Sequence, residues 1–442
     1  MRFSAKLRHR SLTEGKPVVG FIDTRFIMTR ASRYLFTLLF AAPFTSPPSS
    51  CAQSSNVPPT LKGNISTYVY SLEALEPNGT SDRQVFSYES IDLEALDLGT
   101  GGLSLRTYLR TLNNPADADN EGPSAKVYNL YLEYRKPSGN GLIRIGRQFL
   151  YSGVARGKMD GLRFDLTPSN GVTVTGFVGT QEPDGLSTKV DSWSSSHTWG
   201  GRVRVDRIPD TQIGWSFNQR SRHGEEEARL IGIDVMNHSI RPIELYGKFD
   251  YDHIAKRTST LVFQASTRIG SKLSLSGEFA RHHPQMRSNS ILSVFRQEPY
   301  DQVRLRPFFR LTENYGLEGS YGIVRYDGDR THRLSAGLNF GRGSAGFFYR
   351  SGYGGKTAGG YGNLYLIPHD DLEIRLAANY QKYRTVEETS PILESFVSSA
   401  TIDYFRLEPL VLTLELQEAR SPEFESDLRL FFRANYRFRV KK

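Results

Sequence analysis

Apolar and polar residues alternate one by one along the last stretch of the chain. From Asp427 to Val440, one series is Leu428, Leu430, Phe432, Ala434, Tyr436, Phe438 and Val440, and the other is Arg429, Phe431, Arg433, Asn435, Arg437 and Arg439. Successive side chains of a β-strand point to opposite faces, so this stretch predicts a strand with one apolar and one basic face. A core strand with one solvated face would look the same, so the interpretation depends on whether the pattern repeats.

The same alternation returns along the chain from Gly63 onward. Short turns rich in Pro, Gly and Asn, such as 137–141 and 168–171, alternate with longer polar junctions. The longer junctions are expected at 113–124, 149–158, 181–198, 281–301, 351–360, 381–394 and 418–426. Gly and Asn allow the positive φ of tight turns, and Pro presets the bend. We therefore expect an all-β chain of about 22 antiparallel strands, within a range of about 18 to 22.

Composition narrows the class of protein. The 442 residues have a mean hydropathy of -0.44 and contain no apolar run long enough for a transmembrane helix. The formal net charge of +9 is spread along strands, which argues against a nucleic-acid partner. Cys51 is the only cysteine, and His282-His283 has no third ligand in view. No Ser/His/Asp or carboxylate spacing singles out a catalytic site, so we expect no enzyme, metal or cofactor.

The N-terminal part of the chain resembles a bacterial secretory signal peptide. Arg30 and Arg33 precede the apolar run 34–42, and Ser50-Cys51-Ala52 offers small residues for cleavage after Ala52. Met28 would give a leader of ordinary size, so we expect it to be the true start and 1–27 to be a start-site artefact. The expected organisation is an extension and signal peptide at 1–52, a periplasmic lead-in at 53–62 and a barrel at 63–442. Cys51 is also a candidate lipoprotein cysteine, although Pro48-Ser49-Ser50 lacks the expected apolar residue.

One apolar face on so many strands of an exported chain favours a transmembrane β-barrel over a soluble sandwich. Aromatic residues such as Tyr128 and Tyr134, or Tyr251 and Tyr380, suit the interfacial girdles of such a barrel. The whole pattern from 63 to 440 resembles porin-type Gram-negative outer-membrane β-barrels. The resemblance implies one up-and-down barrel with short periplasmic turns and longer extracellular loops. Its implied partners are outer-membrane lipid, lipopolysaccharide and the barrel-assembly machinery. Such barrels usually end on an aromatic residue, whereas Phe438 here precedes Arg439-Val440-Lys441-Lys442.

Arginine dominates the polar faces of the predicted strands. The candidate pore-lining residues are Arg106, Arg110, Arg202, Arg204, Arg304, Arg306, Arg310, Arg333, Arg375, Arg429, Arg433, Arg437 and Arg439. Guanidinium groups stay ionised and bind carboxylate or phosphate through two parallel hydrogen bonds. The sequence therefore predicts a channel for passive diffusion of small hydrophilic solutes that favours anions. The alternative is that arginines and acids pair across strands and only stiffen a water-filled lumen.

Other functions remain open at the level of sequence. The chain could be an outer-membrane β-barrel enzyme, or a sheath or partner for a secreted polymer or periplasmic complex. No globular plug precedes the first predicted strand, so another segment would have to narrow the pore. The loops 181–198 and 281–301, which carry Trp193, His197, His282, His283 and Arg287, are the candidate constriction loops.

Overall fold

The barrel is formed by antiparallel strands that each pair with their neighbours in sequence. The computed structural model describes residues 59–75, 81–98, 102–114, 124–183, 188–283, 298–385, 390–422 and 424–441. The extension and signal peptide expected at 1–52 lie outside these residues, as does most of the lead-in. The strands are β1 (Thr60–Leu75), β2 (Ser81–Leu96), β3 (Leu103–Asn113), β4 (Ser124–Arg135), β5 (Gly141–Ser152), β6 (Ala155–Ser169), β7 (Val172–Gln181), β8 (Ser196–Ile208), β9 (Thr211–Arg222), β10 (Glu225–Asn237), β11 (Ile243–Asp252), β12 (Arg257–Ile269), β13 (Leu273–His282), β14 (Tyr300–Arg310), β15 (Tyr315–Arg325), β16 (Arg330–Phe340), β17 (Gly343–Gly352), β18 (Lys356–His369), β19 (Leu372–Arg384), β20 (Leu393–Tyr404), β21 (Leu410–Arg420) and β22 (Asp427–Lys441).

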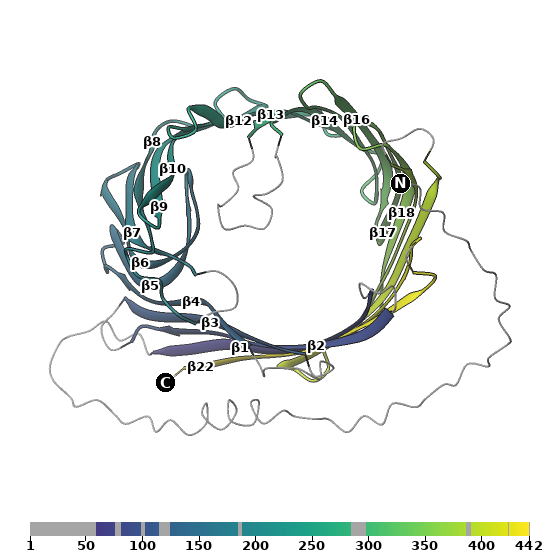
Figure 1. The fold of residues 1–442 in the computed structure, drawn as a ribbon, viewed down its shortest axis with the longest axis horizontal. Coiled ribbons are helices and arrows are strands. Elements are labelled where there is room, and N and C mark those ends of the chain that lie inside the picture. The colour runs from purple at the N-terminus through teal and green to yellow at the C-terminus, as the bar shows by residue number, and fades with distance from the viewer. Residues whose placement is uncertain are drawn as a thin grey trace, which may run out of the picture. The chain divides into compact units, whose positions relative to one another are not determined.

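The sheet closes on itself. β1 pairs antiparallel with β22 from Thr60 opposite Lys441 to Ser71 opposite Leu430. Together with the sequential pairings, this makes a 22-stranded ring, seen end-on in Figure 1. Closure gives every strand two partners and leaves no unpaired edge. The predicted number of strands is confirmed, and β1 begins at Thr60, slightly before the expected boundary at 63.

Apolar side chains on the outer face of the barrel are exposed. Leu130 on β4, Phe263 on β12 and Val303 on β14 retain 47%, 52% and 54% of their accessible surface. Large exposed apolar surface is unusual for a protein surrounded by water, and a barrel in lipid needs it. The outward series of β22, from Leu428 to Val440, follows the same rule.

A charge at the middle of this apolar band should destabilise the folded barrel. Phe263 lies at the centre of β12, so we expect Phe263→Arg to cost about 2–4 kcal/mol in a bilayer. Urea titration of refolding into lipid vesicles, followed by heat-modifiable migration, measures the loss. Gln264→Arg is the matched control, because the next side chain along the strand points to the opposite face. Equal losses for the two variants would contradict the assignment of the faces.

Three expectations about individual segments are wrong. The stretch 351–360, expected as a long junction, is mostly strand, because β17 ends at Gly352 and β18 begins at Lys356. The stretch 149–158, expected as a long loop, continues β5 and β6 through the tight turn at Gly153 and Val154. Tyr128 is also not part of an outer aromatic girdle. The register of β3 and β4 shifts between Tyr108 and Leu109, which leaves Tyr128 as an extra residue. Its ring lies 5.0 Å from the Tyr108 ring and 4.3 Å from the Lys158 ammonium, so it belongs to the polar side.

Candidate functional site: the arginine-lined lumen

Contacts that reach across one or two intervening strands identify the inner face. Arg202 on β8 contacts Asp234 on β10 at 2.6 Å, and the Tyr361 hydroxyl on β18 donates to Glu318 on β15 at 2.9 Å. Side chains converge on the concave side of a closed sheet and diverge on the convex side, so such contacts belong to the lumen. Alternation from these positions places every candidate pore-lining arginine on the same inner face.

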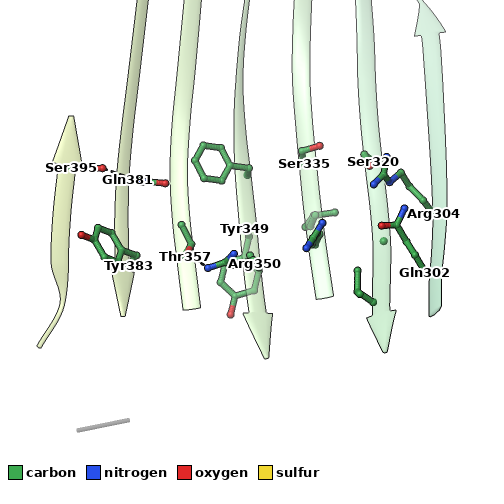
Figure 2. A pocket seen from close by; sticks show the side chains of 15 residues that line it. Gln302, Arg304, Ser320, Ser335, Tyr349, Arg350, Thr357, Gln381, Tyr383 and Ser395 are labelled. Atoms are coloured by element: carbon green, nitrogen blue, oxygen red, sulfur yellow. Dashed lines mark hydrogen bonds between the residues drawn. The ribbon is translucent and has the colours of Figure 1, made fainter. Parts of the chain in front are cut away.

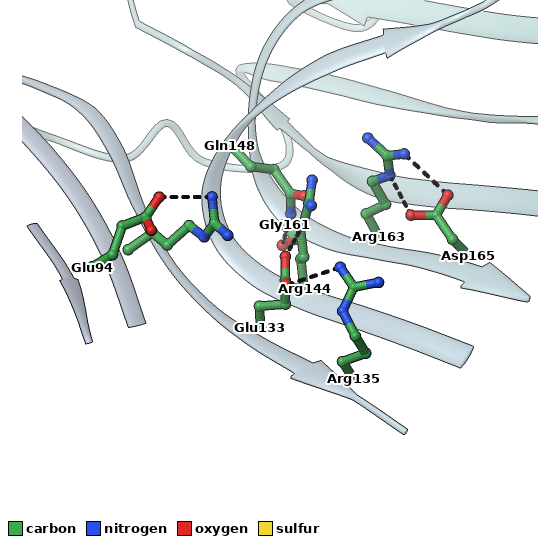
Figure 3. Close-up of polar contacts among 9 residues, drawn as sticks. Glu94, Glu133, Arg135, Arg144, Gln148, Gly161, Arg163 and Asp165 are labelled. Atoms are coloured by element: carbon green, nitrogen blue, oxygen red, sulfur yellow. Dashed lines mark hydrogen bonds and ion pairs between the residues drawn. The ribbon is translucent and has the colours of Figure 1, made fainter. Parts of the chain in front are cut away.

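Many of these arginines have a carboxylate partner. Arg106 contacts Glu94 at 2.9 Å, Arg204 contacts Asp206 at 3.1 Å, and Arg306 contacts Glu278 at 3.2 Å. Arg375 and Arg433 both approach Asp403, and Arg429 contacts Asp427. Figure 3 shows this interleaving near β2 to β6, where Glu133 lies between Arg135 and Arg144 and Arg163 pairs with Asp165. On this part of the wall, ion pairs within and between strands offset part of the positive charge.

The other candidate arginines are not joined to an acid among the described residues. Arg110 stacks over the Tyr88 ring at 4.0 Å. Arg310, Arg437 and Arg439 lie at the end of the barrel that carries the short turns. Arg304, Arg333 and Arg350 form a separate group on β14, β16 and β17, and Arg350 was not among the predicted residues.

This second group lines a pocket in the inner wall. The cavity has a volume of about 630 Å³ and extends over β14 to β20. Figure 2 shows Arg304 and Arg350 on the same wall as polar side chains from neighbouring strands. The inward members of the lining are Gln302, Arg304, Ser320, Gly322, Val324, Arg333, Ser335, Phe348, Arg350, Thr357, Gln381, Tyr383 and Ser395. The pocket lining thus contains three guanidinium groups and no carboxylate.

The tip of the β5–β6 hairpin lies over the inner wall instead of continuing along it. The Val154 amide donates to the Ser216 hydroxyl on β9 at 3.1 Å, and Lys248 on β11 donates to the Gly153 carbonyl at 3.5 Å. Val154 also packs with Ala228 and Leu230 of β10. Because β5 and β6 are remote from β9–β11 in the strand order, the tip must cross the lumen side of β7 and β8.

Small residues of the wall make room for this hairpin. A Cβ atom at Gly232 would lie 2.4 Å from Val154 Cγ1, and one at Gly179 would lie 2.7 Å from Met159 Cγ. Leu150, Ala155 and Met159 of the hairpin form a buried cluster with Phe177 of β7. The hairpin therefore narrows the lumen from one side and is held there by close packing.

A buried ion pair lies at the base of the hairpin. Arg147 on β5 and Asp160 on β6 make two hydrogen bonds, both of 2.7 Å, and their side chains are 4% and 7% exposed. Arg147 also donates to the carbonyls of Val127 and Lys189. These contacts tie the hairpin to β4 and to the segment that follows β7. The sequence did not predict these contacts of Arg147, because regular alternation along β5 places this residue on the outward face.

The hairpin also brings side chains into the lumen that the sequence did not single out. Tyr151 is 72% exposed, and its register partner Arg156 is exposed as well. In the candidate constriction loop 181–198, Trp193 stacks on His197 with ring centroids 4.7 Å apart. In the candidate loop 281–301, His282 is the last residue of β13. Arg287 lies outside the described residues. In the part of the chain that the structure describes, the inward element is the β5–β6 hairpin.

The described residues hold neither a helical membrane span nor a metal site. No helix there is long and apolar enough to cross a membrane. No group of three or more His, Cys, Asp or Glu side chains there could hold a metal ion.

Comparisons with known proteins find likeness among solved structures alone. No family model and no curated protein matches the chain. OccAB3 of Acinetobacter baumannii is 11% identical with a TM-score of 0.41, and the match covers 86% of this chain and 99% of that one. OpdQ of Pseudomonas aeruginosa is 10% identical with a TM-score of 0.41, over 86% and 98%.

A solved translocation pore has a higher TM-score than these two. The translocation pore of the P pilus usher PapC is 9% identical with a TM-score of 0.47, and the match covers 86% of this chain and 99% of that one. Similarities of this size carry no argument about function. The strand pairing, the apolar outer face and the polar inner face of the chain itself give it the architecture of a porin-type outer-membrane β-barrel.

Proposed function

We propose that the protein is an outer-membrane channel for passive diffusion of small hydrophilic solutes, and that its lumen favours anions. The observation that carries this proposal is the group of Arg304, Arg333 and Arg350, none of which forms an ion pair with a carboxylate among the described residues. Fixed positive charge on a water-filled wall raises the local concentration of anions and lowers their barrier to entry. The predicted pore-lining arginines with acid partners would then contribute mainly to a stiff, hydrated wall.

The proposed location follows from the same architecture. The apolar outer face would lie in the outer membrane, in contact with lipid and lipopolysaccharide, after export through the signal peptide expected at 1–52. Insertion of such barrels depends on the barrel-assembly machinery, which we propose as a transient partner. The end of the barrel that carries the short turns, the start of β1 and the end of β22 would face the periplasm.

A salt gradient across a planar bilayer tests ion selectivity. We expect purified protein in a bilayer to give steady conductance with a reversal potential on the anion side. Replacing Arg304, Arg333 and Arg350 together by Gln should move the reversal potential toward zero, because three uncompensated positive charges leave the wall.

The matched control removes a neutral pair from the same lumen. Arg163→Gln combined with Asp165→Asn takes out one arginine and its acid, which lie 3.0 Å apart on β6. We expect this variant to keep the reversal potential of the unmodified protein. A cation preference of the unmodified channel, or equal shifts for the two variants, would refute the proposed selectivity.

A further inference from the structure

We propose that the cavity lined by Arg304, Arg333 and Arg350 is a saturable binding site for acidic oligosaccharides. We call it the three-arginine pocket, with the lining described above. The proposal rests on the proposed channel function, because a ligand reaches this wall only through the lumen. The proposal adds a binding site to a channel through which solutes would otherwise diffuse freely.

The strand register places the three arginines in one row. Arg333 on β16 lies directly opposite Arg350 on β17, and Gly322 on β15 separates Arg333 from Arg304 on β14. Neighbouring strands are about 4.8 Å apart, so the row spans three strand spacings around the wall. Like charges directly opposite each other on a sheet are destabilising unless an anion lies between them. This row therefore has the spacing to hold a ligand with more than one anionic group.

The acids closest to the row along the strands are engaged elsewhere. Glu278, the register partner of Arg304, accepts hydrogen bonds from Arg306 at 3.2 Å and Gln302 at 3.1 Å. Glu318 on β15 accepts from Tyr361 at 2.9 Å and Asn339 at 3.1 Å. Among the described residues, the partners of Arg350 are neutral: the Thr357 hydroxyl and the Gly354 carbonyl, both at 3.4 Å. The guanidinium groups of the pocket thus keep bidentate capacity for an incoming carboxylate.

The remaining lining favours a sugar over an inorganic anion. Ser320, Ser335 and Ser395 supply hydroxyl groups, and Gln302 and Gln381 supply amides. Two aromatic rings, Phe348 and Tyr383, are partly exposed on the same wall and offer apolar faces. Figure 2 shows the Tyr383 ring beside Gln381 and Ser395, at the far side of the pocket from Arg304. The volume of about 630 Å³ suits a ligand of a few sugar units.

Interruptions of the single-channel current measure binding in the pocket. Trigalacturonate, which carries a carboxylate on each sugar, should block the current of the full-length protein with a concentration dependence that saturates. Maltotriose, which has hydroxyl groups but no charge, should leave the current open. Tripolyphosphate, which has charge but no sugar body, should block with shorter dwell times, because it cannot use the hydroxyl, amide and aromatic lining.

Variants connect the block to the pocket. Arg333→Gln and Arg350→Gln should each shorten the dwell time of trigalacturonate about tenfold, since each removes a charge-assisted pair of hydrogen bonds. Arg163→Gln with Asp165→Asn, which removes a balanced pair on β6, should leave the dwell time unchanged. Heat-modifiable migration confirms that each variant is folded before recording.

The outcomes separate this inference from the proposed function. Dwell times that do not change in Arg333→Gln or Arg350→Gln would overturn the pocket, and so would the absence of block by trigalacturonate. Equal block by tripolyphosphate and trigalacturonate would overturn the sugar class. If the reversal potential lies on the anion side but trigalacturonate does not block the current, only the pocket is refuted. If trigalacturonate blocks saturably but the channel shows no anion preference, only the proposed selectivity is refuted.

Discussion

Asp160→Asn is expected to destabilise the folded protein by about 3–5 kcal/mol, because it removes the carboxylate that is hydrogen-bonded twice to the buried Arg147 guanidinium. Arg147 is 4% exposed, so water cannot replace the lost carboxylate. The asparagine side chain can still accept a hydrogen bond, but it carries no charge to offset the desolvation of the guanidinium. Urea unfolding of the protein in detergent, followed by tryptophan fluorescence, measures the loss.

The double variant Arg147→Met with Asp160→Leu is the control for this prediction. Replacing a buried ion pair by apolar residues of similar volume is often close to neutral, whereas removing one partner is costly. The double variant also loses the donors to the Val127 and Lys189 carbonyls, so we expect a smaller but measurable loss of stability. If Asp160→Asn unfolds at the same urea concentration as the unmodified protein, the pair does not anchor the hairpin.

Alternation of apolar and polar residues was enough to predict the strands and their faces. In a closed barrel one face of every strand meets lipid and the other meets water, so the two-residue period persists along the whole chain. This is why Arg304 and Arg333 could be placed on the inner face before any pairing was known. The outward series of β22 could be assigned for the same reason.

The two-residue alternation did not predict the register between strands or the places where the alternation is interrupted. A bulge of a single residue turns Tyr128 from the outer to the inner side, and its sequence context is as regular as that of Tyr134. The tip of the β5–β6 hairpin has the same alternating composition as the strands in the wall. The sequence therefore did not predict that the tip folds into the lumen. Which arginines lack acid partners depends on pairings such as Arg333 with Arg350, and pairing is a property of the closed sheet.

The inner wall is asymmetric. β7 to β11 are covered by the hairpin tip, while β14 to β20 carry the three-arginine pocket. In the strand order these two parts of the wall are separated by β12 and β13. The narrowing and the uncompensated charge thus come from different elements, so variants can change the width of the lumen and its charge independently.

Gly232→Val is expected to push the hairpin tip off the wall into the lumen and lower the single-channel conductance. A Cβ atom at position 232 would lie 2.4 Å from Val154 Cγ1 and 2.6 Å from Asp250 Oδ1, far closer than side-chain atoms normally approach. Overpacking of this kind costs about 1–3 kcal/mol. The tip can relieve the clash by moving into the lumen water, whereas the wall strands are fixed by pairing on both sides. Conductance recorded in symmetrical salt measures the narrower opening.

Two further variants decide whether the contact with Val154 is the cause. Gly247→Val makes the same change on the outward face of the neighbouring strand β11, where a Cβ atom would meet nothing within 4 Å, and should leave the conductance unchanged. Gly232→Val combined with Val154→Gly removes the clashing methyl groups and should restore much of the original conductance. A folded Gly232→Val protein with unchanged conductance would mean that the tip does not limit the current, and that the narrowing lies elsewhere along the lumen.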